Sequence, residues 1–223
     1  MIKAIFIDWG HVFAESFEDK ERKKDAVLKP FGFNWQTFNP YWRMFYILRS
    51  SGKIKNDSEF EKIIRKVVKK DIPVKKLIKI DIDNCLIPVE HIDVVKKLKK
   101  KYKVAILSNN VQEWVEQAIK NYKIGNLFDA LIISSEVGER KPNAKIYYEA
   151  LRRLSVKPEE SVFIADEVAE DLVAASGLGI KTIWFDTKSK GWWGKDDKNV
   201  LIIYKQNATI KKLKEVINVI EKL

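Results

Sequence analysis

The chain has 223 residues, of which 46% are hydrophobic and 11% are aromatic. This length corresponds to one large domain, or to a medium domain with a smaller one attached, and the apolar fraction excludes a chain that is disordered throughout. No apolar run approaches the roughly 20 residues that cross a bilayer, and Asp8 interrupts the N-terminal run, so no membrane segment or signal peptide is expected. The single cysteine, Cys85, cannot form an internal disulfide, which predicts a small buried side chain and a cytoplasmic protein.

The formal net charge is +11, from 42 Lys and Arg against 31 Asp and Glu. Such a surplus is typical of nucleic-acid binding, of attraction for small anionic substrates, or of a heavily solvated surface. Only seven of the 42 basic residues are Arg, whereas recognition of bases and phosphates favours Arg. We therefore interpret the surplus as solvated surface, with nucleic-acid binding as a rival reading, and we expect no nucleic-acid partner and no membrane partner.

Near-continuous apolar runs that end in polar residues recur along the chain and predict buried parallel strands. In chain order these runs are Ala4–Ile7, Val104–Leu107, Leu131–Ile133, Val162–Ala165 and Thr182–Phe185, and Val200–Tyr204 is a further candidate.

Patterns with helical spacing lie between these runs. One helix is expected behind Asn109 or Asn110 as its cap, one with Pro142 at its first position, one that ends near Gly179, and one over Thr209–Leu223. Strands that alternate with helices predict an α/β fold, with a Rossmann-like, mainly parallel sheet flanked by helices.

Residues 15–88 break this alternation, because no buried strand occurs among them. Asp57–Val68 has an amphipathic helical pattern, and Trp35–Leu48 is an aromatic-rich stretch that we read as helix core rather than as a substrate surface. The sequence therefore predicts a core domain of residues 1–14 and 89–223 and an inserted helical cap of residues 15–88, which would lie over the strand ends as a lid.

The carboxyl ends of the predicted strands carry Asp8, Ser108, Asn109, Asp166 and Glu167. In open α/β sheets ligands bind at this edge. We therefore expect the functional site there.

The arrangement resembles the haloacid dehalogenase-like hydrolase superfamily, in the subfamily that has a helical cap after the first strand. Its motifs are Phe6–Val12 around Asp8, Ser108–Asn110, Lys141–Pro142, and Asp166–Glu167 with Asp171 nearby. The resemblance covers nearly the whole chain. It implies a Mg²⁺-dependent phosphatase that hydrolyses a small phosphate monoester through an aspartyl-phosphate at Asp8.

The resemblance also assigns roles to individual residues. Asp8 would be the nucleophile, and Ser108 and Lys141 would be catalytic. Ser108, Asn109 and Lys141 would bind the phosphate, with backbone amides contributing at the helix start. Mg²⁺ would be held by Asp8, Asp166 and the carbonyl of Gly10. Glu167, Glu170 and Asp171 are candidates for outer contacts, or are only favourable charges at a helix start.

Gly10 departs from the commonest pattern of the family, which has a second Asp at this place to carry protons. This departure leaves two alternatives open: carbon–halogen hydrolysis as in the haloacid dehalogenases, and a catalytically weak, degenerate member that acts as a binding protein. His11 could titrate near neutrality, but neighbouring side chains tend to point apart. Trp192 and Trp193, in a predicted loop, would form a contact surface if they are exposed.

Overall fold

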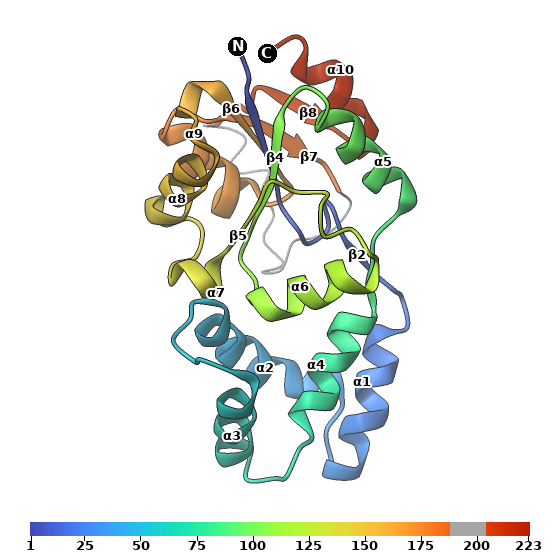
Figure 1. Cartoon of the computed structure of the whole chain (residues 1–223). Helices are drawn as coiled ribbons and strands as arrows, with labels where there is room; N and C mark the ends of the chain where they lie inside the picture. The colour runs from blue at the N-terminus through green and yellow to red at the C-terminus, as the bar shows by residue number, and fades with distance from the viewer. Residues whose placement is uncertain (188–203) are drawn as a thin grey trace.

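The computed structural model describes residues 1–187 and 204–223. Its centre is a sheet in the order β5-β4-β1-β6-β7-β8, in which every neighbouring pair is parallel (Figure 1). The strands are β1 (Ala4–Ile7), β4 (Lys103–Ser108), β5 (Ala130–Ile133), β6 (Ser161–Ala165), β7 (Lys181–Phe185) and β8 (Ala208–Ile210). The expected α/β fold and all five of the main predicted strands are confirmed.

Both faces of the sheet are covered by helices. Successive residues of β1 alternate between two hydrophobic clusters, with Ile5 and Ile7 in one and Ala4 and Phe6 in the other. The first cluster includes residues of α5 (Val89–Leu98), α6 (Gln112–Asn121) and α10 (Val216–Ile220); the second includes α8 (Ala144–Leu154) and α9 (Val173–Gly177). Burial on both faces explains why the strands read as continuous apolar runs.

The C-terminal region differs from the prediction. Ala208–Ile210 forms the edge strand β8 beside β7, and the helix begins only at Val216, after a 3₁₀ turn over Leu213–Glu215. Pairing with β7 therefore overrides the helical spacing of the first residues of this segment. The candidate strand at 200–204 and the Trp192–Trp193 pair lie outside the described residues, except for Tyr204, which is not in a strand.

Four helices lie between β1 and α5: α1 (Lys20–Leu28), α2 (Trp35–Ser50), α3 (Asp57–Val68) and α4 (Val74–Asp83). They share a third hydrophobic cluster, in which Phe38, Trp42 and Phe60 are buried. The chain enters and leaves this unit through an antiparallel pair of short strands, β2 (Glu15–Ser16) and β3 (Cys85–Leu86). In Figure 1 the four helices lie together, beyond α6 and the short helix α7 (Ser134–Val137).

The helical unit contacts the sheet domain through α6. The ring of Trp114 stacks on that of Trp42, with the ring centroids 6.2 Å apart, and its indole nitrogen donates a hydrogen bond to Asp57. Among the described residues, no helix is both long and apolar enough to cross a membrane.

Candidate active site

The site lies beside β1, where the order in which successive strands are added to the sheet changes from one side of β1 to the other. β1 is flanked by β4 on one side and by β6 on the other, so the carboxyl ends of these three strands meet in the middle of the sheet. Asp8 follows β1, Ser108 ends β4 and Asp166 follows β6. Ligands of open α/β folds bind at such a switch point.

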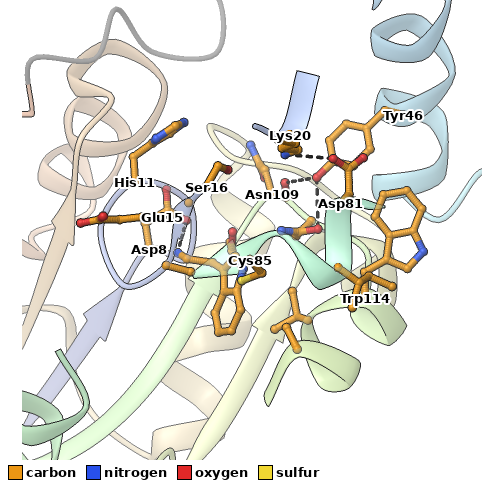
Figure 2. A pocket seen from close by; sticks show the side chains of 18 of the residues that line it. Asp8, His11, Glu15, Ser16, Lys20, Tyr46, Asp81, Cys85, Asn109 and Trp114 are labelled. Carbon is orange, nitrogen blue, oxygen red and sulfur yellow. Dashed lines mark hydrogen bonds and ion pairs between the residues drawn. The ribbon is translucent and has the colours of Figure 1, made fainter. Parts of the chain in front are cut away.

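A cavity of about 600 Å³ opens above these strand ends (Figure 2). Its lining includes all six of the predicted site residues: Asp8, Gly10, Ser108, Asn109, Lys141 and Asp166. The opposite wall comes from helices α1, α2 and α4, so the cavity lies between the two parts of the chain. Cys85 also lines it and is only half-buried, contrary to the prediction of a buried side chain.

Both carboxylate oxygens of Asp8 have partners. The backbone amide of Trp9 donates a 2.7 Å hydrogen bond to Oδ1, and the Nζ atom of Lys141 lies 3.2 Å from Oδ2. Asp8 is 8% exposed, so these contacts are poorly screened by water. They fix the orientation of the carboxylate toward the cavity.

Lys141 is buried between two carboxylates. Its Nζ atom donates a 2.9 Å hydrogen bond to Asp171 and also contacts Asp8. Burial alone would lower the pKa of Lys141, but the neighbouring charges of Asp171 and Asp8 outweigh it and raise that pKa above its usual value. The lysine therefore carries a fixed positive charge beside the Asp8 carboxylate.

The side chain of Asn109 holds the backbone of Lys141 in place. Its Oδ1 atom accepts a 2.7 Å hydrogen bond from the Lys141 amide, and its Nδ2 atom donates a 3.0 Å bond to the Lys141 carbonyl. The same Nδ2 lies 3.2 Å from Glu170. The Asn109 amide side chain is thus committed to positioning Lys141, a role that the sequence analysis did not assign to it.

The residues after β4 form a bend rather than the start of a helix. Helix α6 begins at Gln112, whose amide donates to the hydroxyl of Ser135, and Val111 occupies the cap position. The prediction that Asn109 or Asn110 caps this helix is therefore wrong, because a serine from a distant segment does so. Ser108 is 4% exposed, and within the described part of the chain its hydroxyl has no hydrogen-bond partner.

Pro142 lies outside the helix whose first position it was predicted to occupy. Helix α8 begins at Ala144, and the side chain of Asn143 accepts a 2.9 Å hydrogen bond from the amide of Lys145. An Asn cap satisfies a free amide at the helix end that Pro142 could not. Lys141 consequently lies in the loop before the helix and reaches back to the ends of the strands.

Asp8, Asp166 and Asp171 each offer an oxygen within 4.8 Å of the others. Burial, followed by the charges of Asp8 and Glu167, raises the pKa of Asp166 to about 8. A set of close, mutually repelling carboxylates suits a hard divalent cation such as Mg²⁺, which prefers oxygen ligands. The residues present therefore fit the metal that the sequence analysis expected.

Asp171 is closer to the centre of the site than the sequence analysis placed it. A π-helical turn, Val168–Leu172, carries it, and such turns are frequent at functional sites. The sequence shows Asp171 only as one of the three acidic residues that closely follow Asp166. Nothing in the spacing indicates which of the three turns inward toward Lys141.

Gly10 and His11 lie in the loop after β1. A Cβ atom added to Gly10 would meet no other atom within 4 Å, so there is room for a side chain at the cavity wall. His11 is exposed, adopts a φ of 59° and also lines the cavity. Glu167 and Glu170 line the same wall.

The fold resembles those of several solved proteins. A HAD phosphatase from Thermococcus onnurineus matches with a TM-score of 0.70 and 18% identity, over 98% of each chain. A HAD family enzyme from Bacteroides thetaiotaomicron, in complex with magnesium and inorganic phosphate, matches with a TM-score of 0.71 and 23% identity over 88% of this chain and all of that one. A 2-haloacid dehalogenase from Pseudomonas syringae matches with a TM-score of 0.70 and 17% identity over 100% of this chain and 99% of that one.

The sequence resembles several curated phosphatases over part of its length. It is 34% identical to the glyceraldehyde 3-phosphate phosphatase of Pyrococcus furiosus over 92 residues, which are 40% of this chain and 38% of that protein. It is 26% identical to the pyrophosphatase PpaX of Bacillus mycoides over 59% of this chain and 58% of that protein. The chain thus spans less than two thirds of the length of these relatives.

The sequence model of the family described as haloacid dehalogenase-like hydrolase matches residues 42–185, most of the chain. This match agrees with the α/β fold and with the cluster of polar residues at the carboxyl edge of the sheet. The chain belongs to the haloacid dehalogenase-like hydrolase family.

Proposed function

We propose that the protein is a Mg²⁺-dependent phosphatase that hydrolyses a small phosphate monoester through an aspartyl-phosphate at Asp8. The observation that carries this proposal is the buried ammonium group of Lys141, which lies 3.2 Å from Asp8 and 2.9 Å from Asp171 at the floor of the cavity. A fixed positive charge beside a carboxylate nucleophile suits the transfer of an anionic phosphoryl group. The phosphatases among the relatives support the same reaction class.

The proposed reaction has two steps. In the first, a carboxylate oxygen of Asp8 bonds to phosphorus while the bond from phosphorus to the ester oxygen breaks, and the alcohol leaves after taking up a proton. In the second, water attacks the aspartyl-phosphate, which releases inorganic phosphate and restores the Asp8 carboxylate. Lys141 neutralises charge on the transferring oxygens, and the Ser108 hydroxyl with the backbone amide of Asn109 binds them.

Asp8, Asp166 and the carbonyl of Gly10 would hold Mg²⁺, with Asp171 beside them. When bound, the ion reduces the repulsion between the anionic nucleophile and the anionic ester. The closeness of Asp8, Asp166 and Asp171 favours this metal-dependent chemistry over carbon–halogen hydrolysis, which needs no metal. Release of halide from a haloacid in the presence of chelator would reverse this order.

We further propose that residues 15–88 act as the cap and that their closure excludes water from the site. This proposal is supported by the hydrophobic cluster that helices α1 to α4 share, which Val111 and Trp114 join from the sheet domain, and by the residues that these helices contribute to the cavity wall.

Asp8→Asn tests the assignment of the nucleophile. We expect hydrolysis of p-nitrophenyl phosphate to fall by roughly 10³-fold or more, because an amide is a poor nucleophile. Asp186→Asn is the matched control, since Asp186 also follows a strand, β7, but is not part of the cavity lining. Activity retained by Asp8→Asn would exclude the proposed mechanism, and a wild-type protein that binds Mg²⁺ but hydrolyses no phosphate ester would favour the degenerate binding protein.

A further inference from the structure

A second charged cluster lies in the wall of the cavity opposite the strand ends. Lys20 and Lys24 of α1 both approach the same carboxylate oxygen, Oδ1 of Asp81 in α4, at 2.9 and 2.7 Å. All three residues line the cavity that contains Asp8. In Figure 2 a dashed line marks the ion pair between Lys20 and Asp81, which lie on the other side of the cavity from Asp8.

Lys24 is fixed in this cluster and is 2% exposed. Its ammonium group lies 3.6 Å from the centre of the Trp35 ring and 5.0 Å from that of Trp42, besides its contact with Asp81. Lys24 and Asp81 therefore form a buried pair of opposite charges, held by aromatic faces that favour a cation.

Lys20 gives the cluster its excess positive charge. One carboxylate serves two ammonium groups, so the cluster carries a net charge of about +1 when all three groups are ionised. The side chain of Lys20 is 28% exposed, which leaves it accessible from the cavity. Burial lowers the pKa of Lys24 to about 8; the charge of Asp81 opposes this shift, and the charge of Lys20 adds to it.

Other charges near the cluster act more weakly on its centre. Glu15, Glu18 and Glu21 line the same cavity but are exposed, so water and salt screen them. Arg43 of α2, which is half-buried, adds a further positive charge to this wall. An anionic group that reaches the cluster meets Lys20 in partly dehydrated surroundings, where a charged hydrogen bond is strong.

We propose that Lys20, positioned by Asp81, binds a second anionic group of the substrate, so that preferred substrates are small phosphate esters that also carry a carboxylate or a second phosphate. This inference rests on the proposed function, because it places the transferred phosphate at Asp8 and the second anion at the opposite wall. Lys24 is a positioning residue that neutralises Asp81 and leaves the charge of Lys20 available to the substrate.

The test uses three esters with the same three-carbon skeleton: glycerol 3-phosphate, 3-phosphoglycerate and glycerol 1,3-bisphosphate. We expect the wild-type kcat/KM to be roughly tenfold higher for 3-phosphoglycerate than for glycerol 3-phosphate, mainly through KM, because one charged hydrogen bond is added. Glycerol 1,3-bisphosphate has a second phosphate but no carboxylate, so its comparison with 3-phosphoglycerate distinguishes a second phosphate from a carboxylate as the preferred anion. Lys20→Met should bring the ratios close to one, and Lys20→Glu should invert them.

Arg22→Met is the matched control, because it removes one positive charge from the same helix at a side chain that is 83% exposed and is not part of the cavity lining. It should leave the ratios as in the wild type. Equal hydrolysis by the wild type of the esters with and without a second anionic group, or an equal loss for all three in Lys20→Met, would overturn the inference.

Calorimetry separates this inference from the proposed function. In an Asp8→Asn background, which should not turn over, 3-phosphoglycerate should bind about tenfold more tightly than glycerol 3-phosphate, and adding Lys20→Met should remove the difference. If the wild type hydrolyses none of the esters, the proposed function fails, and these affinities still decide whether the anion subsite exists. Equal affinities for the two esters would overturn the subsite.

Discussion

At the scale of single residues, the site depends on a few charges held at close range. The ammonium group of Lys141 lies between the carboxylates of Asp8 and Asp171. The side chain of Asn109 forms hydrogen bonds with both the backbone amide and the backbone carbonyl of Lys141. The strand pattern predicted that Asp8 and Asp166 meet, because strand ends converge in a parallel sheet, and the family resemblance added Lys141 to them. It could not predict the role of the Asn109 side chain, since that depends on how close a loop 32 residues away approaches.

Removal of the Lys141 charge should affect both activity and stability. Lys141→Met leaves the buried carboxylates of Asp8 and Asp171 without their partner, so we expect kcat to fall by roughly 10²-fold or more and the protein to be destabilised when Mg²⁺ is absent. Kinetics and thermal unfolding with and without Mg²⁺ check this expectation. A kcat close to that of the wild type would contradict the proposed role.

Gly10→Asp should restore a proton carrier. Because the position has room for a side chain, we expect faster hydrolysis of alkyl phosphates, whose leaving groups are poor, with a gain of up to about 10²-fold, and a small effect on p-nitrophenyl phosphate. Gly10→Asn is the control, since its side chain has nearly the same shape but does not titrate. Equal rates in the two variants would show that proton transfer does not limit turnover.

At the scale of elements, hydrophobic periodicity located the buried strands and several helices, among them α3 and α8, while contacts between distant segments determined the helix caps and the edge strand. Short runs such as Val162–Ala165 are apolar because both faces of the sheet are covered, which makes them visible in the sequence. The edge strand β8 has three residues and depends on pairing with β7. Its own sequence carries no strand pattern, so the spacing of its apolar residues predicted a helix instead. The cap of α6 likewise comes from Ser135, which no local pattern could indicate.

Two asparagines at the ends of neighbouring elements should behave differently when each is replaced by alanine. Asn109→Ala releases the loop that carries Lys141, so we expect kcat to fall by roughly tenfold or more. Asn143→Ala removes the cap of α8 and should lower the free energy of unfolding by about 1 kcal/mol without a comparable loss of kcat. Denaturant titrations and kinetics on both variants check this contrast; similar kcat values for the two would argue against a positioning role for Asn109.

At the scale of the whole molecule, two folded parts line one cavity. Its described lining holds more acidic than basic residues, so the +11 charge of the chain does not arise there. The sequence indicated both parts, because the strand pattern stops after Asp8 and resumes at Val104. It did not reveal that Lys20, Lys24 and Asp81 face the site, since their contacts arise only when α1 packs on α4. Lysines are too numerous in this chain for one outside a motif, such as Lys20, to be selected without the fold.

The pH dependence of stability should report on the acidic cluster. Without metal, Asp166 retains its proton in the folded protein up to a pH of about 8 but loses it near 4 in the unfolded chain, so its contribution to stability falls as the pH rises between these values. Because Mg²⁺ binds the ionised form, its stabilising effect should increase from pH 6.5 to 8.5. Differential scanning fluorimetry with Mg²⁺ and with chelator checks this trend. A Mg²⁺ effect that is independent of pH, or that is retained in Asp166→Asn, would contradict it.

The central claim is that Asp8 is phosphorylated during turnover. Its most direct test is to mix the wild-type protein with Mg²⁺ and p-nitrophenyl phosphate, quench in acid, and analyse the peptides by mass spectrometry. We predict one phosphoryl group on the peptide that contains Asp8, located at Asp8 by fragmentation and absent from Asp8→Asn. Turnover of the ester with no phosphoryl group on Asp8 at any quench time would contradict the account.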